Sequence, residues 1–393
     1  MTVLAGSGTS RLPEAFAAGQ AAAEQATIPL QGATPSLVLV FSTDIYDQST
    51  VIAGVRSVTG SAPLTGCCTG GIISAAGPSA TGVSVLVLHS PALEVQSALV
   101  ENLGSDPVGV AEAAAEHVEE FVRANGAQPS VALMFADGLT ASLTEAVRSA
   151  GSVLGPLCRM VGGGAGDNLR FKETSVFLND RCASDAFTIS LLNDELPIGI
   201  GIQHGWIPVG RGMVVTRSEG RIVHEFDGQP ALEAYRNLFP EAHLSPENFT
   251  EFVMAHPIGL PQAGGEFLVR DPIRANPDGS ISFIATVPEH AVAHIMRGDP
   301  DTLFAAAENA TQRAIAQLNG APLVAVVVFD CVSRLLMLRA GAKTEIQRIR
   351  TIAGESTPIA GMFSFGEIAA EYGPAAFHNK TVVVYAIGQK QSA

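Results

Sequence analysis

The sequence contains little charge and few aromatic side chains for its length. Charged residues make up 16% of the 393 residues, with one tryptophan and four tyrosines, whereas hydrophobic residues reach 47%. This composition is typical of a compact globular chain and excludes a disordered one. A chain of this length exceeds the usual size of a single hydrophobic core, so we expect two packed units.

Positive charge and long apolar runs are also scarce. The chain has 23 Lys and Arg against 38 Asp and Glu, a formal net charge of −15, which disfavours nucleic acid as a partner. The longest apolar runs, such as residues 323–329, have the length of buried strands rather than the roughly 18 residues of a membrane helix. The first residues of the sequence lack the basic segment and the apolar segment that are typical of a signal peptide. We expect no membrane insertion and a cytoplasmic location.

Cysteine pairs and metal-binding spacings are missing too. The five cysteines include no Cys-x-x-Cys pair, which favours reduced thiols over a disulfide framework or a zinc site. His290 and His294 stand four residues apart and so share a face, but no third ligand is evident. We expect no metal site.

Short apolar runs alternate with longer amphipathic ones along the chain. Runs typical of strands cover residues 36–42, 83–89, 131–135 and 186–192, and helical patterns cover 12–26, 110–126 and 139–151. After a turn at Asp227 and Gly228 a new helix and a second series of this kind follow. The pattern predicts an α/β protein of two layered domains, 1–228 and 229–393, with a ligand cleft between them. No internal repeat is visible.

The stretch LTGCCTGGIIS, residues 64–74, places Cys67 and Cys68 between glycines. They can be small residues at a crowded strand end, contacts to a ligand together with Thr69, or nucleophiles. No nearby histidine in the sequence supports the nucleophile. We favour small residues that line a pocket.

A second glycine-rich stretch, GGGAGDNLRF, covers residues 162–171. It is not the dinucleotide-binding pattern, because no helix is expected after it. Gly163 and Gly164 would allow close approach of a ligand, with Asp167 and Arg170 beside it. The alternative is a packed crossing with an Asp167–Arg170 salt bridge.

In the C-terminal half, FDCVSR ends a predicted strand and begins a helix, a place where α/β sheets present groups to ligands. Cys331 and Arg334 of this stretch are therefore candidates for contact with a ligand. Glu367 follows a glycine, and Asn379 precedes the last strand. The alternative is structural, with an Arg334–Glu367 ion pair and Asn379 as a turn residue.

These motifs, taken in order with FLVRDPI at 267–273 and HNKT at 378–381, resemble the FIST proteins, which consist of a FIST N and a FIST C domain. The resemblance implies an intracellular signal-transduction sensor that binds a small ligand, with amino acids suggested for the family. It also implies a histidine kinase, a cyclase or a chemotaxis receptor as partner. Cys68, Ile72 and Ser333 depart from the residues common in the family, which bears on the ligand more than on the fold.

From the motifs and the resemblance together we expect a ligand site without catalytic or metal-binding residues. Its expected members are Cys67, Cys68, Thr69, Gly163, Gly164, Asp167, Arg170, Arg270, Cys331, Arg334, Glu367 and Asn379. The three arginines would clamp the carboxylate of an amino acid or other small metabolite.

Two other functions compete with this one, and we expect no cofactor in the leading case. One branch of the resembled family implies a haem-based nitric oxide sensor, for which His224, His256 and His378 are the favoured axial ligands over His204, His290 and His294. The other is an enzyme that uses Cys67 or Cys331 as nucleophile. We lean away from an enzyme.

Overall fold

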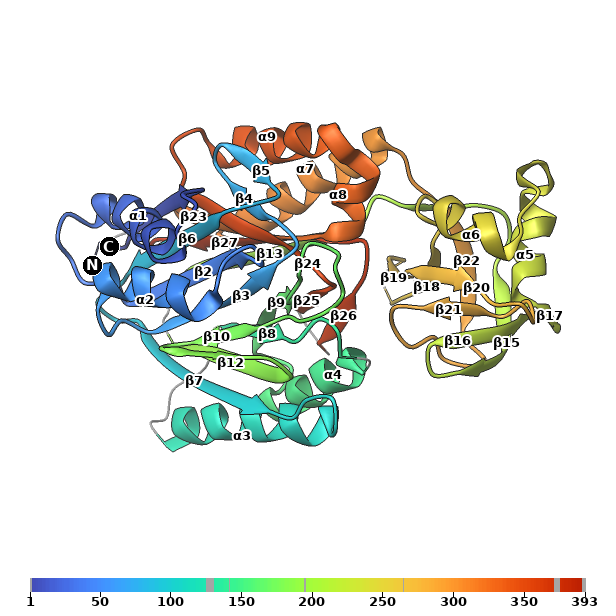
Figure 1. The fold of residues 1–393 in the computed structure, drawn as a ribbon, viewed down its shortest axis with the longest axis horizontal. Coiled ribbons are helices and arrows are strands. Elements are labelled where there is room, and N and C mark those ends of the chain that lie inside the picture. Colours follow the sequence, from blue (N-terminus) through green and yellow to red (C-terminus); the bar gives the residue numbers. More distant parts are fainter. Residues whose placement is uncertain are drawn as a thin grey trace.

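The computed structural model describes residues 2–124, 131–140, 142–193, 196–263, 265–370 and 375–390. It is a mixed α/β protein, as the alternating patterns predict. Figure 1 shows a large main body and a small lobe that stands to one side of it. Within the described residues no helix is long and apolar enough to cross a membrane.

The main body consists of three units that repeat one order of elements. The first is β1 (Leu4–Ser10), α1 (Ala15–Thr27), β2 (Leu37–Thr43), α2 (Gln48–Thr59), β3 (Leu64–Thr69), β4 (Ile72–Ser74), β5 (Gly77–Ser79) and β6 (Val83–His89). The second is β7 (Glu94–Glu101), α3 (Pro107–Ala124), β8 (Val131–Ala136), α4 (Leu143–Leu154), β9 (Arg159–Gly164), β10 (Val176–Leu178), β11 (Arg181–Ala183) and β12 (Ala186–Asn193). The expected end of the second unit's first helix, near residue 126, lies outside the described residues.

The third unit begins before the small lobe and continues after it. It comprises β13 (Ile198–Gln203), α7 (Pro300–Ala316), β23 (Leu323–Cys331), α8 (Val332–Leu338), α9 (Ala342–Ala353), β24 (Ile359–Ser364), β25 (Glu367–Ala370), β26 (Ala376–His378) and β27 (Val382–Gly388). The strand predicted at 323–329 and the helix predicted after Cys331 are confirmed as β23 and α8.

The three units form three six-stranded sheets with the same pairing order. The orders are β1-β6-β2-β3-β10-β11, β7-β12-β8-β9-β25-β26 and β13-β27-β23-β24-β4-β5. In each sheet two central strands run parallel, β2 with β3, β8 with β9 and β23 with β24. Each unit also gives a hairpin to a neighbouring sheet, so that β4, β10 and β25 pair with β24, β3 and β9. The exchange is cyclic, and no unit completes a sheet alone.

Equivalent residues of the three units meet at the centre. The rings of Phe41, Phe135 and Phe329 are buried with centroids 5.9, 6.0 and 6.1 Å apart. Beside them the strand ends are joined by the same hydrogen bond three times, Gly70 N to Phe363 O, Gly166 N to Cys68 O and Phe365 N to Gly164 O, at 2.9–3.0 Å. The main body therefore has approximate threefold symmetry, which the sequence did not reveal as a repeat.

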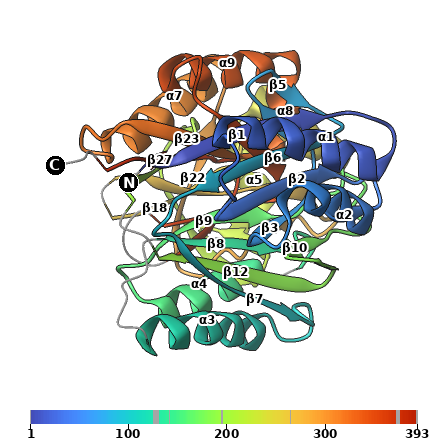
Figure 2. The same cartoon turned by 90° about the vertical axis from the view of Figure 1, so that its left-hand side faces the viewer.

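Helices cover the outer faces of the sheets. Figures 1 and 2 place α1 with α2, α3 with α4, and α7 with α9 on three different sides of the strands. α1, α2 and α4 each bury an alanine- or valine-rich stripe, which suits close helix packing. Gly66, Gly162 and Gly361 hold equivalent positions in the parallel strands, where a Cβ would lie 1.8–2.1 Å from a neighbouring carbonyl oxygen. A side chain at any of these positions would push two strands apart.

The small lobe is an insertion in the third unit. In the first two units a loop joins the first strand to the next helix, residues 11–14 and 102–106, whereas residues 204–299 separate β13 from α7. The lobe contains β14 (Ile207–Pro208), β15 (Met213–Glu219), β16 (Ile222–Phe226), β17 (Gln229–Pro230), α5 (Ala231–Leu238), α6 (Pro246–Val253), β18 (Ile258–Pro261), β19 (Phe267–Arg270), β20 (Pro272–Ala275), β21 (Ile281–Phe283) and β22 (Val292–Arg297). It has a hydrophobic core of its own.

The division of the chain expected at residue 228 falls inside this lobe, at the turn between β16 and β17. The sheets of the main body combine strands from both sides of that residue, for example β9 with β25 and β13 with β27. The boundary between two domains at residue 228 stays a prediction. In space the molecule divides into the main body and the small lobe, and the ends of that lobe lie at the ends of the insertion between β13 and α7.

Candidate functional site

A cavity of about 470 Å³ lies where the small lobe faces the main body. The second unit contributes residues of the loop before α4 and of the loop after β9. The third contributes the start of α8 and residues near β25 and β26, and the lobe contributes α6, β20 and the end of β21. Its lining includes Leu139, Leu169, Phe171, Arg221, Asp271, Ile273, Ile284, Cys331, Ser333, Leu336, Phe365 and Asn379.

The rim of the cavity is apolar and comes from both parts of the molecule. Five of its large hydrophobic side chains are 37–61% exposed: Leu139, Phe171, Ile273, Ile284 and Leu336. Exposed apolar side chains are ordinary when scattered, but a group of them around a concavity is a feature of ligand sites.

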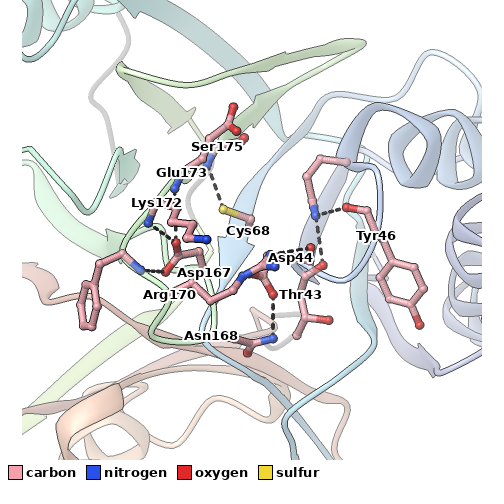
Figure 3. Close-up of polar contacts among 12 residues, drawn as sticks. Thr43, Asp44, Tyr46, Cys68, Asp167, Asn168, Arg170, Lys172, Glu173 and Ser175 are labelled. Atoms are coloured by element: carbon pink, nitrogen blue, oxygen red, sulfur yellow. Dashed lines mark hydrogen bonds and ion pairs between the residues drawn. The ribbon is translucent and has the colours of Figure 1, made fainter.

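The glycine-rich stretch forms part of this wall through a braced loop (Figure 3). Asp167 is buried, and its carboxylate accepts hydrogen bonds from the backbone N–H groups of Phe171, Lys172 and Glu173 at 2.6–3.2 Å. Asn168 donates to the Asp44 carboxylate at 2.7 Å, and Arg170 forms an ion pair with it. The predicted Asp167–Arg170 salt bridge is therefore wrong, because Asp167 serves the backbone and Arg170 reaches across to Asp44.

This bracing directs two apolar side chains into the cavity. Leu169 and Phe171 have φ values of 65° and 51°, a left-handed conformation that such residues adopt only when their surroundings impose it. Phe171 stacks on Phe365 with ring centroids 5.2 Å apart, and all three side chains line the cavity. The charged residues of the motif thus hold the loop, and its apolar residues face the open space.

Cys67, Cys68 and Thr69 lie on β3 within the core and are not among the cavity-lining residues. The Cys67 sulfur lies 3.4 Å from that of Met362, and Cys68 Sγ accepts from Ser175 N. Thr69 Oγ1 contacts the carbonyl oxygens of Gly71 and Phe363. Burial raises the pKa of both thiols well above the ordinary value, so neither is a thiolate at neutral pH.

Gly163 and Gly164 lie on β9, directly behind the cavity wall. A Cβ on Gly163 would be 2.9 Å from the Ser364 Cβ, and one on Gly164 would be 2.7 Å from the Phe365 carbonyl oxygen. Gly164 N donates to Gly366 O at 2.8 Å. These glycines bring the second and third units into contact.

The structure does not bring the three expected arginines together, and none of them is a described lining residue of the cavity. Arg170 is paired with Asp44. Arg270 donates to the carbonyl oxygens of Thr286 and Phe377 at 2.9 and 3.1 Å.

Arg334 is fully buried between two carboxylates. It pairs with Asp330 at 2.9 Å and with Glu345, and it donates to the carbonyl oxygens of His204 and Leu303. The predicted Arg334–Glu367 ion pair is wrong, because Asp330 and Glu345 occupy the guanidinium. Burial and the neighbouring Glu345 raise the pKa of Asp330.

The floor of the cavity is polar. Asp271 of the lobe lies 3.1 Å from Lys380 Nζ and accepts from Ser333 Oγ at 2.7 Å. Lys380 is buried, also donates to Met254 O, and lies 5.4 Å from the centre of the Trp206 ring. Cys331 and Asn379 complete the floor, 4% and 2% exposed.

Glu367 lies behind this floor and is fully buried. Its carboxyl contacts Ser364 Oγ at 2.7 Å and Thr381 N at 3.1 Å, and burial raises its pKa to about 8. Ser364 Oγ is also 3.2 Å from Asp330 O. A hydroxyl has one hydrogen, so a protonated Glu367 that donates to Ser364 allows both contacts to form.

Cys331 is the thiol at the cavity, but its surroundings do not activate it. Burial, and the nearby Glu367 and Asp271, raise its pKa well above the ordinary value. Nucleophilic thiols need the opposite, a cationic setting that lowers the pKa.

The histidines lie away from the described lining of the cavity. His256 stacks on Phe252 at 4.1 Å, His294 packs edge-on against Phe267, and burial lowers the pKa of His378 to about 4. Within the described part of the chain, no three His, Cys, Asp or Glu side chains are grouped to hold a metal ion. The haem alternative stays a prediction.

Sequence reasoning missed Arg221, Asp271 and Lys380. Asp271 and Lys380 stand within the motifs FLVRDPI and HNKT, next to Arg270 and Asn379, so the signal was present but the neighbouring residues were chosen. Arg221 belongs to no motif of the sequence. It could not be found from the sequence because only the folding of the lobe carries it to the cavity.

Comparison with known proteins assigns the family. The model of the FIST N domain matches residues 36–229, and that of the FIST C domain matches residues 231–370. The chain belongs to the FIST family. FIST domains are signal-transduction sensor domains, and the predicted family and sensor class are thereby confirmed.

Similar chains occur in mycobacteria. The uncharacterized protein Rv0628c of Mycobacterium tuberculosis is 26% identical over 388 residues, 95% of this chain and 96% of that protein. The uncharacterized protein Mb0898c of Mycobacterium bovis is 26% identical over 237 residues, 58% and 59% of the two chains.

Solved structures resemble this one only distantly. A cyanuric acid hydrolase aligns over 99% of this chain and 100% of its own, with 10% identity and a TM-score of 0.36. PurLQS from Thermotoga maritima aligns over 99% and 73%, with 10% identity and a TM-score of 0.24. These TM-scores are too low to support any conclusion about function.

Proposed function

We propose that this FIST protein senses a small metabolite with a carboxylate and an apolar body, such as an amino acid, by binding it in the cavity between the small lobe and the main body. Occupancy would then be passed to a partner protein, of the histidine kinase, cyclase or chemotaxis classes that the family resemblance suggests. The observation that carries this proposal is the cavity itself, with apolar walls over a floor of a few fixed polar groups.

The position of the lobe supports the proposal. The main body repeats one unit three times, and the third alone carries a large insertion between its first strand and the next helix. That insertion supplies Arg221, Asp271, Ile273 and Ile284 to the cavity. The departure from symmetry and the cavity thus lie at the same place.

Arg221 is the cation best placed for a carboxylate. Its guanidinium lies 3.5 Å from the Ile284 carbonyl oxygen, and Ile284 N donates to Asp271 O at 2.9 Å. It is an exposed lining residue, so its fork of donors is accessible to a bound ligand. It takes the role that the sequence suggested for Arg170, Arg270 and Arg334.

A ligand in this cavity is well placed to act on the junction of the two parts. Several contacts join the lobe to the main body beside it: Lys380 with Asp271, Arg270 with Phe377 O, and Thr286 with Glu145 at 2.9 Å. A ligand that touches both sides would favour one arrangement of the lobe over others.

A thermal-shift screen of amino acids and small carboxylates tests the proposal. A ligand present at 100 times its dissociation constant stabilises the folded state by about 2.7 kcal/mol. Arg221→Ala should weaken the shift, whereas Arg217→Ala, which removes a half-exposed arginine paired with Glu225 on the same lobe, should not. No shift with any compound, or equal shifts in both variants, would contradict the proposed site.

A further inference from the structure

We infer that Asn379 and Asp271 form an acceptor pair that selects a ligand with a hydrogen-bond-donating head group, a cationic amine in preference to a neutral or acidic group. This inference rests on the proposed ligand cavity and adds a specificity-determining residue to it. It concerns the buried end of the cavity, which offers hydrogen-bond acceptors, whereas Arg221 offers a cation to the carboxylate of the ligand.

Asn379 offers a buried acceptor that has no donor in the described structure. The residue is 2% exposed, and its amide Nδ2 donates to His378 O at 3.0 Å. Its Oδ1 is buried without a hydrogen-bond partner, although the residue lines the cavity. Buried carbonyl oxygens are normally paired, so this atom marks a place that a donor from a ligand or a bound water would fill.

Asp271, which lines the same cavity, supplies a carboxylate. One carboxylate oxygen faces Lys380 Nζ and the other accepts from Ser333 Oγ. A carboxylate has about four lone-pair sites, so these two contacts fix its orientation and leave room for a ligand donor. Lys380 itself is fully buried and is not a described lining residue, whereas Asp271 and Asn379 both belong to the lining of the cavity.

In the other two units the residue equivalent to Cys331 is occupied by hydrogen bonds within the protein. By the register of the sheets, Thr43 and Asp137 correspond to Cys331. Thr43 exchanges hydrogen bonds with the backbone of Gly82, and the Asp137 carboxylate accepts from Leu139 N and Asp185 N at 3.0 and 2.7 Å, as well as from Thr174. In the third unit Cys331, Asp271 and Asn379 line a cavity instead.

The chemical consequence is a preference at one end of the ligand. An ammonium group can satisfy Asn379 Oδ1 and the Asp271 carboxylate together, as a charge-assisted donor. A carboxylate at the same place would meet two acceptors and leave Asn379 unpaired, which we expect to weaken binding by about tenfold or more. The apolar wall accepts the rest of either molecule.

Two matched sets of probes test this by calorimetry on the full chain. The first is leucine, 3-methylbutylamine and 4-methylpentanoate, and the second is phenylalanine, 2-phenylethylamine and 3-phenylpropanoate. In each set we expect the amino acid to bind best and the amine to bind more tightly than the acid. An acid that binds as tightly as the matched amine would overturn the inference and leave the ligand cavity in place.

Variants separate recognition from a merely structural role. Asn379→Leu should weaken the binding of the amine and of the amino acid by about tenfold and leave the affinity for the acid unchanged. Asn379→Asp keeps an acceptor and should retain amine binding. The matched control is Asn237→Leu, an exposed asparagine of the lobe. Equal loss in both Asn379 variants, or loss of acid and amine alike, overturns the acceptor role. Failure of all six probes and of the complete amino acid screen would overturn the proposed function, and the inference with it.

Discussion

Cys67 and Cys68 show how the setting of a residue decides its role. Their positions on β3 correspond to Gly163 and Gly164 on β9, and to Met362 and Phe363 on β24. They therefore belong to the ring where three strand ends meet, and Cys68 O accepts one of its three hydrogen bonds. Small size suits this position, and the raised pKa of both thiols makes them poor nucleophiles. A ligand-contact role for them stays a prediction.

The first prediction concerns Glu367, whose pKa is raised from 4.5 to about 8 by burial. Between these values the folded carboxyl keeps a proton that the unfolded chain has released, so this group makes folding stability fall as pH rises from about 4.5 to about 8. Glu367→Gln mimics the protonated form, and its amide can donate to Ser364. We expect a smaller loss of stability between pH 5 and 8 than in the unchanged protein.

Urea unfolding midpoints at both pH values measure this difference. Glu308→Gln is the control, because Glu308 is a partly exposed acid paired with Arg348, and it should leave the pH dependence nearly unchanged. If Glu367→Gln keeps the full pH dependence of the unchanged protein, Glu367 is ionised in the folded state.

At the scale of elements, the loop after β9 joins stability to the cavity. Its left-handed residues Leu169 and Phe171 need the Asp167 carboxylate, which satisfies three backbone N–H groups. Such a loop is rigid before a ligand arrives, and preorganisation reduces the entropy lost on binding. The glycines before it serve the contact between units.

We therefore predict that Asp167→Ala destabilises the fold by about 1–3 kcal/mol, because three partly buried backbone N–H groups lose their acceptor. It should also weaken ligand binding, since the Leu169 and Phe171 side chains would no longer be held in place. Asp180→Ala is the matched control, because the Asp180 carboxylate is 82% exposed and pairs with Arg56. We expect this variant to lower the free energy of unfolding by at most about 1 kcal/mol. Chemical denaturation and the thermal-shift screen give both readouts. Equal effects in the two variants would refute the bracing role.

For the whole molecule, the three sheets form one interlocked body to which the lobe is added. The hairpin exchange means that each unit needs its neighbours, whereas the lobe enters and leaves through adjacent segments, since Ile207 pairs with Arg297 between β14 and β22. Insertions whose ends lie together disturb a host fold little.

Replacement of residues 206–297 by a short Gly/Ser linker should accordingly leave the main body folded. Circular dichroism should show a cooperative transition at a lower temperature, because the walls of the cavity and the main-body residues packed with Trp206, such as Leu303 and Phe304, lose their cover. The ligand-induced thermal shift should disappear, because Arg221 and Asp271 are gone. A main body that fails to fold, or a truncated chain that keeps the shift, would contradict this account.

The sequence alone determined the α/β class, the course of strands such as β2, β12 and β23, and the family, because these depend on local periodicity and on short motifs in a fixed order. It also pointed to Cys331 and Asn379 at the cavity floor. Only the tertiary structure decided the threefold arrangement, because the three units share pairing geometry without visible sequence repetition. It likewise decided the partners of Arg170 and Arg334, since an ion pair depends on which side chains the fold brings within reach. Asp44 reaches Arg170 from another unit, and Glu345 reaches Arg334 from the next helix, α9.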